Sequence, residues 1–229
     1  MREIVFDTET TGLDPATGHR LVEIGCVELL NFIPTGLTFH RYLDPQRDMP
    51  EEAFRVHGLG SEFLTGKPLF ADIVEELLVF LGDARLVAHN AEFDLRFLNS
   101  EFVRTGRSTF GMERIVDTLS IARRRHPGSP NSLDALCSRY RVDNSRRTKH
   151  GALLDAEILA EVYAELVGGR QAELILADNG LDIRLRENAP KAKRPAPLPP
   201  AISAEEIEAH AQFVAGLGAP TVWRDYGLG

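Results

Sequence analysis

Two acidic residues follow an apolar run close to the start of the chain. Ile4-Val5-Phe6 is β-branched and aromatic, which predicts a buried strand, and Asp7 and Glu9 come directly after it. Because side chains alternate along an extended chain, these two carboxylates point to the same side and repel each other. A hard divalent cation such as Mg²⁺ or Mn²⁺ would relieve that repulsion. For this pair alone, turn residues would be the simpler interpretation.

Two further acids occupy positions that would otherwise belong to the core. Asp94 shares a predicted helix face with the apolar residues three and four positions later, and Asp155 does the same on a second helix. A carboxylate on the apolar side of a helix is costly unless it is paired or bound to a metal. One such residue could be a helix cap or the partner of a buried arginine. Four misplaced acids are better explained by one shared metal site.

His150 is the candidate proton acceptor beside these acids. It precedes Asp155 by five positions, about 140° around a regular helix, so both cannot face the metals from one helix. Gly151 lets the chain turn, which places His150 on the loop before the helix. A lone histidine is more often structural or merely exposed, but beside a carboxylate cluster it suits a general base. With two divalent ions, this set suits hydrolysis of a phosphodiester.

The elements that must position these residues begin with strands and continue as strand–helix alternation. Strands are predicted at the opening apolar run Ile4-Val5-Phe6, at 21–30, at 37–43 and at 86–88. A turn near Pro34 and Gly36 is expected to separate the second strand from the third. Helices are predicted at 50–56, 70–81, 91–103, 117–125, from 131 onward and at 152–167. This order indicates an α/β fold, a mixed sheet covered by helices.

Composition limits the classes of protein that the chain can belong to. The net charge of −8 over 229 residues argues against a broad basic surface that binds nucleic acid. An enzyme that acts on nucleic acid can still obtain its affinity for the substrate from another source. No apolar run reaches the length of a membrane span, and no signal peptide precedes the first strand. Cys26 and Cys137 lack metal spacing, so we expect a cytoplasmic protein with free thiols.

The composition changes near the carboxyl end of the chain. Residues 188–200 hold five prolines, which is typical of an extended linker. Ser203 is the expected cap of a helix over 204–215, and the only tryptophan, Trp223, follows. We therefore divide the chain into a domain at 1–186, a linker at 187–203 and a tail at 204–229. The tail is too short for its own core, which favours a docking peptide anchored by Trp223.

Three motifs in order give the chain a family resemblance. DTETTG at 7–12, HNAEFD at 89–94 and HGALLD at 150–155 resemble the exonuclease motifs of the DnaQ-like family, in its His-containing (DEDDh) branch. Further segments, VHGL at 56–59 and NSLDALCSRY at 131–140, are similar to the members that proofread for bacterial replicative DNA polymerases. The resemblance implies a ribonuclease H-like fold, with a mixed five-stranded sheet flanked by helices, and a 3′–5′ DNA exonuclease that releases nucleoside monophosphates.

The resemblance also implies a role for each site residue. Asp7 would bridge two divalent metal ions, Glu9 and Asp155 would complete the ligands of the first, and Asp94 would help to hold the second, directly or through water. His150 would be the general base. The family binds the 3′-terminal nucleotide beside the first motif and the VHG segment, which implies contacts from a set of five residues: Thr10, Leu13, Val56, His57 and Phe93. Apolar side chains in that set could contact a base.

Charged residues near the motifs leave two interpretations each. Asp117 is expected to be a helix cap or a support for the site in preference to a metal ligand. Arg146-Arg147 and Thr148-Lys149 add positive charge beside the site, and they could meet a phosphate or belong to a solvated loop.

A short segment after the last core helix resembles a clamp-binding peptide. Gln171, Leu174 and Leu176 match the spacing of peptides that bind the sliding clamp, although a last helix packing on the domain is the alternative. The implied partners are a DNA 3′ end, the catalytic subunit of the replicative polymerase, the clamp and a small accessory subunit, with no membrane. The alternative functions are a same-fold exoribonuclease, similar to RNase T or oligoribonuclease, and a non-catalytic polymerase-binding scaffold.

Overall fold

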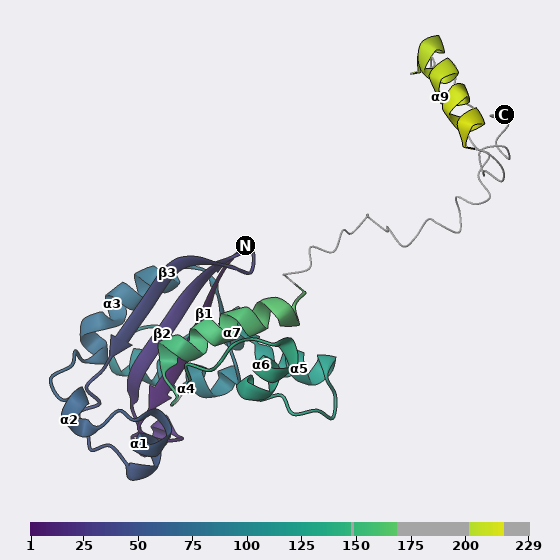
Figure 1. Ribbon diagram of the computed structural model, residues 1–229. Helices are drawn as coiled ribbons and strands as arrows, with labels where there is room; N and C mark the ends of the chain where they lie inside the picture. Colours follow the sequence, from purple (N-terminus) through teal and green to yellow (C-terminus); the bar gives the residue numbers. More distant parts are fainter. Residues whose placement is uncertain (148, 169–201, 218–229) are drawn as a thin grey trace, which may run out of the picture. The chain divides into compact units, whose positions relative to one another are not determined.

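The computed structural model describes residues 1–147, 149–168 and 202–217 (Figure 1). They fall in two compact units, one within Met1–Ile175 and one within Leu176–Gly229. The expected clamp peptide with Gln171, Leu174 and Leu176, most of the linker, and Trp223 lie outside the described residues. None of the helices in the described ranges is long and apolar enough to cross a bilayer.

The first unit is built on a mixed five-stranded sheet. Its strands are β1 (Arg2–Thr10), β2 (Leu21–Leu30), β3 (Ile33–Tyr42), β4 (Arg85–Ala88) and β5 (Ile115–Asp117). The order across the sheet is β3-β2-β1-β4-β5. The first three strands form an antiparallel meander, and β1, β4 and β5 run parallel to one another. The predicted mixed sheet is confirmed, and β1, which carries Asp7 and Glu9, lies at its centre.

The hairpin between β2 and β3 differs from the prediction. The turn lies at Asn31 and Phe32, both at positive φ, and not near Pro34 and Gly36. Two successive residues at positive φ make the type of two-residue turn that matches the twist of the strands. Pro34 is tolerated because β3 is an edge strand, where one missing N–H group need not break a ladder. The strand therefore begins at Ile33, four residues earlier than predicted.

Helices cover both faces of the sheet (Figure 1). One core cluster joins Ile4 and Phe6 of β1 to α3 (Phe70–Leu81) and α4 (Ala91–Arg104). A second cluster joins Val5 to α7 (Ala152–Leu166), which runs across β1 and β2. The remaining helices of this unit are α1 (Glu51–His57), α2 (Ser61–Leu64), α5 (Thr118–Arg125) and α6 (Leu133–Tyr140), with 3₁₀ turns at Pro15–Thr17 and Met112–Arg114.

A close approach between α7 and the sheet depends on Gly25 of β2. A Cβ atom at this position would lie 2.2 Å from the backbone nitrogen of Leu153, which is too close for any side chain. Gly25 is also the register partner of Asp7 on β1. The glycine thus lets the first turn of α7 rest on β2 directly beside Asp7.

The second unit contains α9 (Ala204–Gly216). As predicted, Ser203 caps it: the Ser203 hydroxyl accepts from the backbone N–H of Glu206, whose side chain accepts from the backbone N–H of Ser203. This reciprocal arrangement is a capping box, which fixes where the helix begins.

Candidate active site

A cleft of about 540 Å³ opens at the end of β1. It is lined by four members of the predicted catalytic set, which are Asp7, Glu9, Asp94 and His150. All five residues predicted to contact the terminal nucleotide also line it, namely Thr10, Leu13, Val56, His57 and Phe93. The fifth predicted catalytic residue is Asp155. It lies on α7, and its Oδ2 is 3.2 Å from Nδ1 of His150. The structure therefore brings together residues that are up to 148 positions apart in the chain.

Asp7 and Glu9 are two positions apart on β1, and their charged forms are both disfavoured. Burial raises the pKa of Asp7 well above its usual value, and the carboxylates of Asp94, Glu9 and Asp155 raise it further. The pKa of Glu9 rises from 4.5 to about 8, first through burial and then through the carboxylates of Glu23, Asp155 and Asp94. Such a cluster needs positive charge if it is to be ionised near neutral pH.

Asp94 enters the cluster from the first turn of α4. Its side chain is buried, and the hydroxyl of Thr8 donates to its Oδ1 at 2.7 Å. Burial raises the pKa of Asp94 to about 7, although the hydrogen bond from Thr8 opposes that rise. Thr8 lies between Asp7 and Glu9 on β1, so this bond ties the helix to the strand that carries the other two acids.

Asp155 differs from the other three acids because it is already paired with a cation. Arg147 donates to its Oδ1 from Nε at 2.5 Å and to its Oδ2 from Nη2 at 2.7 Å. Burial would raise the pKa of Asp155, but hydrogen bonds from His150 and Arg147 lower it below its usual value. Arg147 also donates to Asp134 at 2.9 Å, and its side chain is only 8% exposed. This is neither of the two roles considered for Arg147, which were phosphate contact and solvation.

The ion pair between Arg147 and Asp155 was not predicted, because Arg147 is adjacent to Arg146 and nothing in the sequence distinguishes the two arginines. Arg146 behaves as a surface residue, with its guanidinium 3.8 Å from Glu157. Lys149 places its ammonium 5.1 Å from the centre of the Phe54 ring on α1. Asp117 caps α5, as expected, by accepting from the backbone N–H groups of Leu119 and Ser120.

His150 lies on the loop before α7, and its neighbours require opposite tautomers. Its Nδ1 is 3.2 Å from Oδ2 of Asp155, a contact in which Nδ1 carries the proton and donates. The same atom is 2.7 Å from Nη2 of Arg147, which can only donate. Only the tautomer that donates to Asp155 leaves Nε2 free to accept a proton. The ring is half exposed, so Nε2 can reach a bound water.

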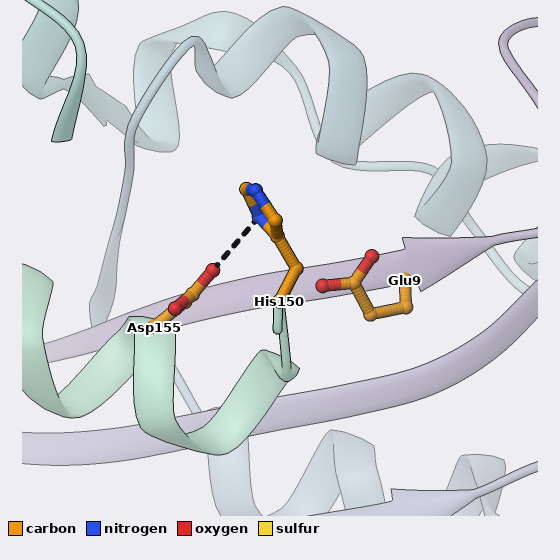
Figure 2. A group of neighbouring side chains, drawn as sticks. All are labelled: Glu9, His150 and Asp155. Carbon is orange, nitrogen blue, oxygen red and sulfur yellow. Dashed lines mark ion pairs between the residues drawn. The ribbon is translucent and has the colours of Figure 1, made fainter. Parts of the chain in front are cut away.

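Three of these side chains form a group that could hold a metal ion. Ligand atoms of Glu9, His150 and Asp155 all lie within 4.8 Å of one another (Figure 2). The donors fit a hard divalent cation, since they are mostly carboxylate oxygens, and burial followed by neighbouring carboxylates raises the pKa values of Asp7, Glu9 and Asp94. A bound cation would stabilise the ionised forms of these acids.

The other side of the cleft carries exposed aliphatic side chains and a buried histidine. Leu13 is 79% exposed and Val56 is 49% exposed, which is unusual for aliphatic side chains beside a polar site. Nδ1 of the buried His57 accepts from the backbone N–H of Leu59 at 3.0 Å, so Nε2 carries the proton of the neutral ring. Burial lowers the pKa of His57, which keeps the ring neutral. The aliphatic side chains and the neutral ring of His57 can contact a base or sugar without adding charge.

Comparison with known proteins gives the family of the chain. The exonuclease family model RNase_T matches residues 4–163. DNA polymerase III subunit epsilon of Rickettsia felis is 46% identical over 95% of this chain and 97% of that protein. The same subunit of Escherichia coli K12 is 49% identical over 74% of this chain and 72% of that protein.

Solved structures share the fold at lower identity. Exonuclease X in complex with 5′ overhanging duplex DNA matches with a TM-score of 0.57 at 24% identity, over 72% of this chain and 91% of that one. The nuclease domain of 3′hExo, a DEDDh family member bound to rAMP, matches with a TM-score of 0.63 at 16% identity, over 73% and 92%. The cleft, the family model and the near full-length relatives agree: this chain belongs to the exonuclease family that contains the epsilon subunits of DNA polymerase III.

Proposed function

We propose that this protein is the proofreading 3′–5′ exonuclease of a replicative DNA polymerase. It hydrolyses the 3′-terminal phosphodiester of DNA and releases nucleoside monophosphates. The observation that carries the proposal is the convergence of Asp7, Glu9, Asp94, Asp155 and His150 on one cleft that also exposes the aliphatic side chains of Leu13 and Val56. The carboxylates supply a metal site, and the aliphatic side chains supply a place for the terminal base.

Two divalent ions, Mg²⁺ or Mn²⁺, are the proposed cofactors. Asp7 would help to hold both ions, Glu9 and Asp155 would complete the first site, and Asp94 would help to hold the second, directly or through water. When bound, the ions activate a water molecule and stabilise the leaving oxygen. Burial raises the pKa values of Asp7, Glu9 and Asp94, and neighbouring carboxylates raise them further, which supports this assignment because a bound cation would stabilise the ionised acids.

His150 takes the proton from the attacking water. This requires the tautomer in which Nδ1–H donates to Asp155 and Nε2 carries the free lone pair. The carboxylate of Asp155 also stabilises the imidazolium that forms. Nη2 of Arg147 lies 2.7 Å from Nδ1 and 3.4 Å from Nε2, so its contact with His150 must be released before Nε2 can accept a proton.

The 3′-terminal nucleotide occupies the side of the cleft that carries Leu13 and Val56. Leu13 and Phe93 pack against the base, and Thr10, Val56 and His57 contact the sugar and the base edge. The exposed state of Leu13 and Val56 supports this placement, because both side chains gain an apolar partner when a nucleotide binds.

Delivery to the primer end comes from partners. The segment at 171–176 binds the sliding clamp, the tail at 204–229 binds the polymerase subunit through Trp223, and a small accessory subunit is a further candidate partner. The formal charge of −8 supports a tethered enzyme, since an acidic protein has little electrostatic hold on DNA. A proline-rich linker raises the effective concentration of the nuclease at the primer end.

Cleavage of a labelled primer tests the function. The protein, with Mg²⁺ or Mn²⁺, should shorten a mismatched 3′ end faster than a matched one, and addition of the polymerase should increase the rate. The Asp7→Ala variant should lose at least about 10²–10³-fold, the scale of removing one electrostatic stabiliser. A matched RNA strand tests the exoribonuclease alternative, which full-length similarity to epsilon subunits does not favour. Preference for RNA, or activity retained in Asp7→Ala, would refute the proposal.

A further inference from the structure

A second groove of about 590 Å³ opens beside the active-site cleft. Polar side chains dominate its lining, which includes His89, Asn90, Arg123, Ser129, Asn131 and Ser132. His89 and Asn90 also line the active-site cleft, so the two hollows share a wall. The far side of this groove is formed by α5 and the turn before α6. It contains no catalytic residue and no residue predicted to contact the terminal nucleotide.

The shared wall is held firmly in place. The backbone N–H groups of Asn90 and Ala91 donate to Oδ1 of Asp117 at 3.0 and 3.3 Å. The Thr118 hydroxyl donates to the carbonyl of Ala88, so it accepts from Nδ1–H of His89 at 2.9 Å. Asn90 adopts a left-handed conformation, with φ of 66°, immediately before α4. A ligand that crosses this wall therefore meets a rigid surface, and little order has to be gained on binding.

The charge of the groove is opposite to that of the cleft. The active-site cleft is lined by Asp7, Glu9, Asp14, Glu52 and Asp94, whereas none of the described residues that line the second groove is acidic. Its one cationic side chain is that of the exposed Arg123. This residue is the first of three consecutive arginines in the last turn of α5. In a protein with a net charge of −8, an arginine placed beside hydroxyl and amide groups suits a phosphate.

We propose that the second groove binds the part of the same DNA strand that lies upstream of the cleaved bond. This inference rests on the proposed exonuclease function. A strand whose last nucleotide occupies the cleft has to leave it, and the groove continues the cleft across His89 and Asn90. Arg123 contacts a backbone phosphate, and Ser129 and Asn131 offer hydrogen bonds to the sugar–phosphate chain. These contacts recognise the sugar–phosphate backbone of the DNA and do not depend on its base sequence, as is usual for contacts to phosphates.

Chain-length dependence of cleavage tests the groove. The wild-type protein should cleave a thymidine octanucleotide with a higher kcat/KM than a dinucleotide, because only the longer strand fills the groove. In Arg123→Gln, the ratio of the two kcat/KM values should fall about 5- to 10-fold, mainly through KM, as expected for one exposed charge-assisted contact. The slope of log KM against log salt should decrease by about 0.7, the value for one phosphate of a single strand.

Arg124→Gln is the matched control. It removes the same charge from the neighbouring position of α5, but Arg124 does not line the groove. It should leave the length ratio, the salt slope and the far-ultraviolet circular dichroism spectrum unchanged. Arg123→Lys keeps the charge but lacks the planar guanidinium group. Compared with Arg123→Gln, it should retain most of the wild-type salt slope and part of the wild-type length ratio.

The outcomes separate the two proposals. Failure of the wild-type protein to cleave either substrate would refute the exonuclease function itself. Cleavage of both substrates at equal kcat/KM, or an equal loss in Arg123→Gln and Arg124→Gln, would overturn the groove while the function stands. A loss in Arg123→Gln that is confined to duplex primer ends would assign the groove to the complementary strand and would also overturn the proposal.

Discussion

Replacing Glu9 with glutamine should stabilise the metal-free protein, and the gain should grow with pH. Glu9 is 7% exposed, and its pKa is raised from 4.5 to about 8 by burial and by Glu23, Asp155 and Asp94. The unfolded chain ionises this carboxyl above pH 4.5, while the folded chain holds the proton until about pH 8. Ionisation therefore favours the unfolded chain throughout that interval, and the free energy of unfolding falls as pH rises.

The size of the effect follows from the pKa values. The difference between 4.5 and about 8, at 1.36 kcal/mol for each pH unit, corresponds to about 5 kcal/mol when both states are fully ionised. At pH 8 half of the folded protein still holds the proton, so the penalty is about 4 kcal/mol, whereas at pH 5 it is about 1 kcal/mol. These are upper limits because the site relaxes and water enters. Glu9→Gln should therefore gain roughly 2–4 kcal/mol at pH 8 relative to the wild type, and at most about 1 kcal/mol at pH 5.

Urea unfolding in EDTA at the two pH values measures this. The exposed residue Glu92, at the start of α4, provides the control. Glu92→Gln should change stability by less than about 1 kcal/mol and in the opposite direction, because it removes a favourable interaction with the helix dipole. Addition of Mg²⁺ at pH 8 should raise the stability of the wild type more than that of Glu9→Gln, since the variant has lost a proposed ligand.

Two results would refute this reasoning. If the wild type in EDTA is as stable at pH 8 as at pH 5, burial and the neighbouring carboxylates do not disfavour the ionised form of Glu9. If Glu9→Gln destabilises the protein at pH 8, the carboxylate makes a favourable contact in the folded state that outweighs its burial and its repulsion by neighbouring acids.

The remaining predictions concern the base and the partners. His150→Ala should lower turnover by roughly 10²–10⁴-fold with little change in metal affinity by calorimetry, and loss of metal binding would make His150 a ligand. Replacing Gln171, Leu174 and Leu176 together with alanine should weaken binding to the clamp while cleavage of free single strands is kept; unchanged clamp affinity would leave the segment without that role. Trp223→Ala should weaken binding to the polymerase subunit by about 2 kcal/mol or more in a pull-down or calorimetric titration, and full affinity would exclude it as the anchor.

Much of the fold could be predicted because its longer elements have clear periodicity. The strand at 21–30 and the helix at 70–81 have the predicted bounds, and Asp94 and Asp155 are buried on the apolar faces where their spacing placed them. Helix α2 and strand β5 were not predicted, since elements of four and three residues show no period. The start of β3 was predicted wrongly because Phe32 is not a typical turn residue, although it takes a turn conformation.

The contacts within the site were harder to predict than its members. Motifs and spacing could indicate which side chains share the cleft, but not that Arg147 binds both oxygens of Asp155 and contacts His150. An arginine in a polar loop has the same sequence environment whether it is buried or solvated. The groove beside the cleft depends on α5 and the turn before α6 lying near Asn90, which is a tertiary arrangement.

The central position of β1 has a consequence for synthesis of the protein on the ribosome. Asp7 is made well before its neighbours in the site: β1 obtains its parallel neighbour only with β4, and Asp155 arrives with α7 at the far end of the nuclease unit. Folding therefore depends on contacts between distant parts of the chain, which form slowly and late. A chain that is released early lacks part of the carboxylate set. Nuclease activity is thus withheld until almost the whole unit has been translated, so incomplete products cannot attack DNA.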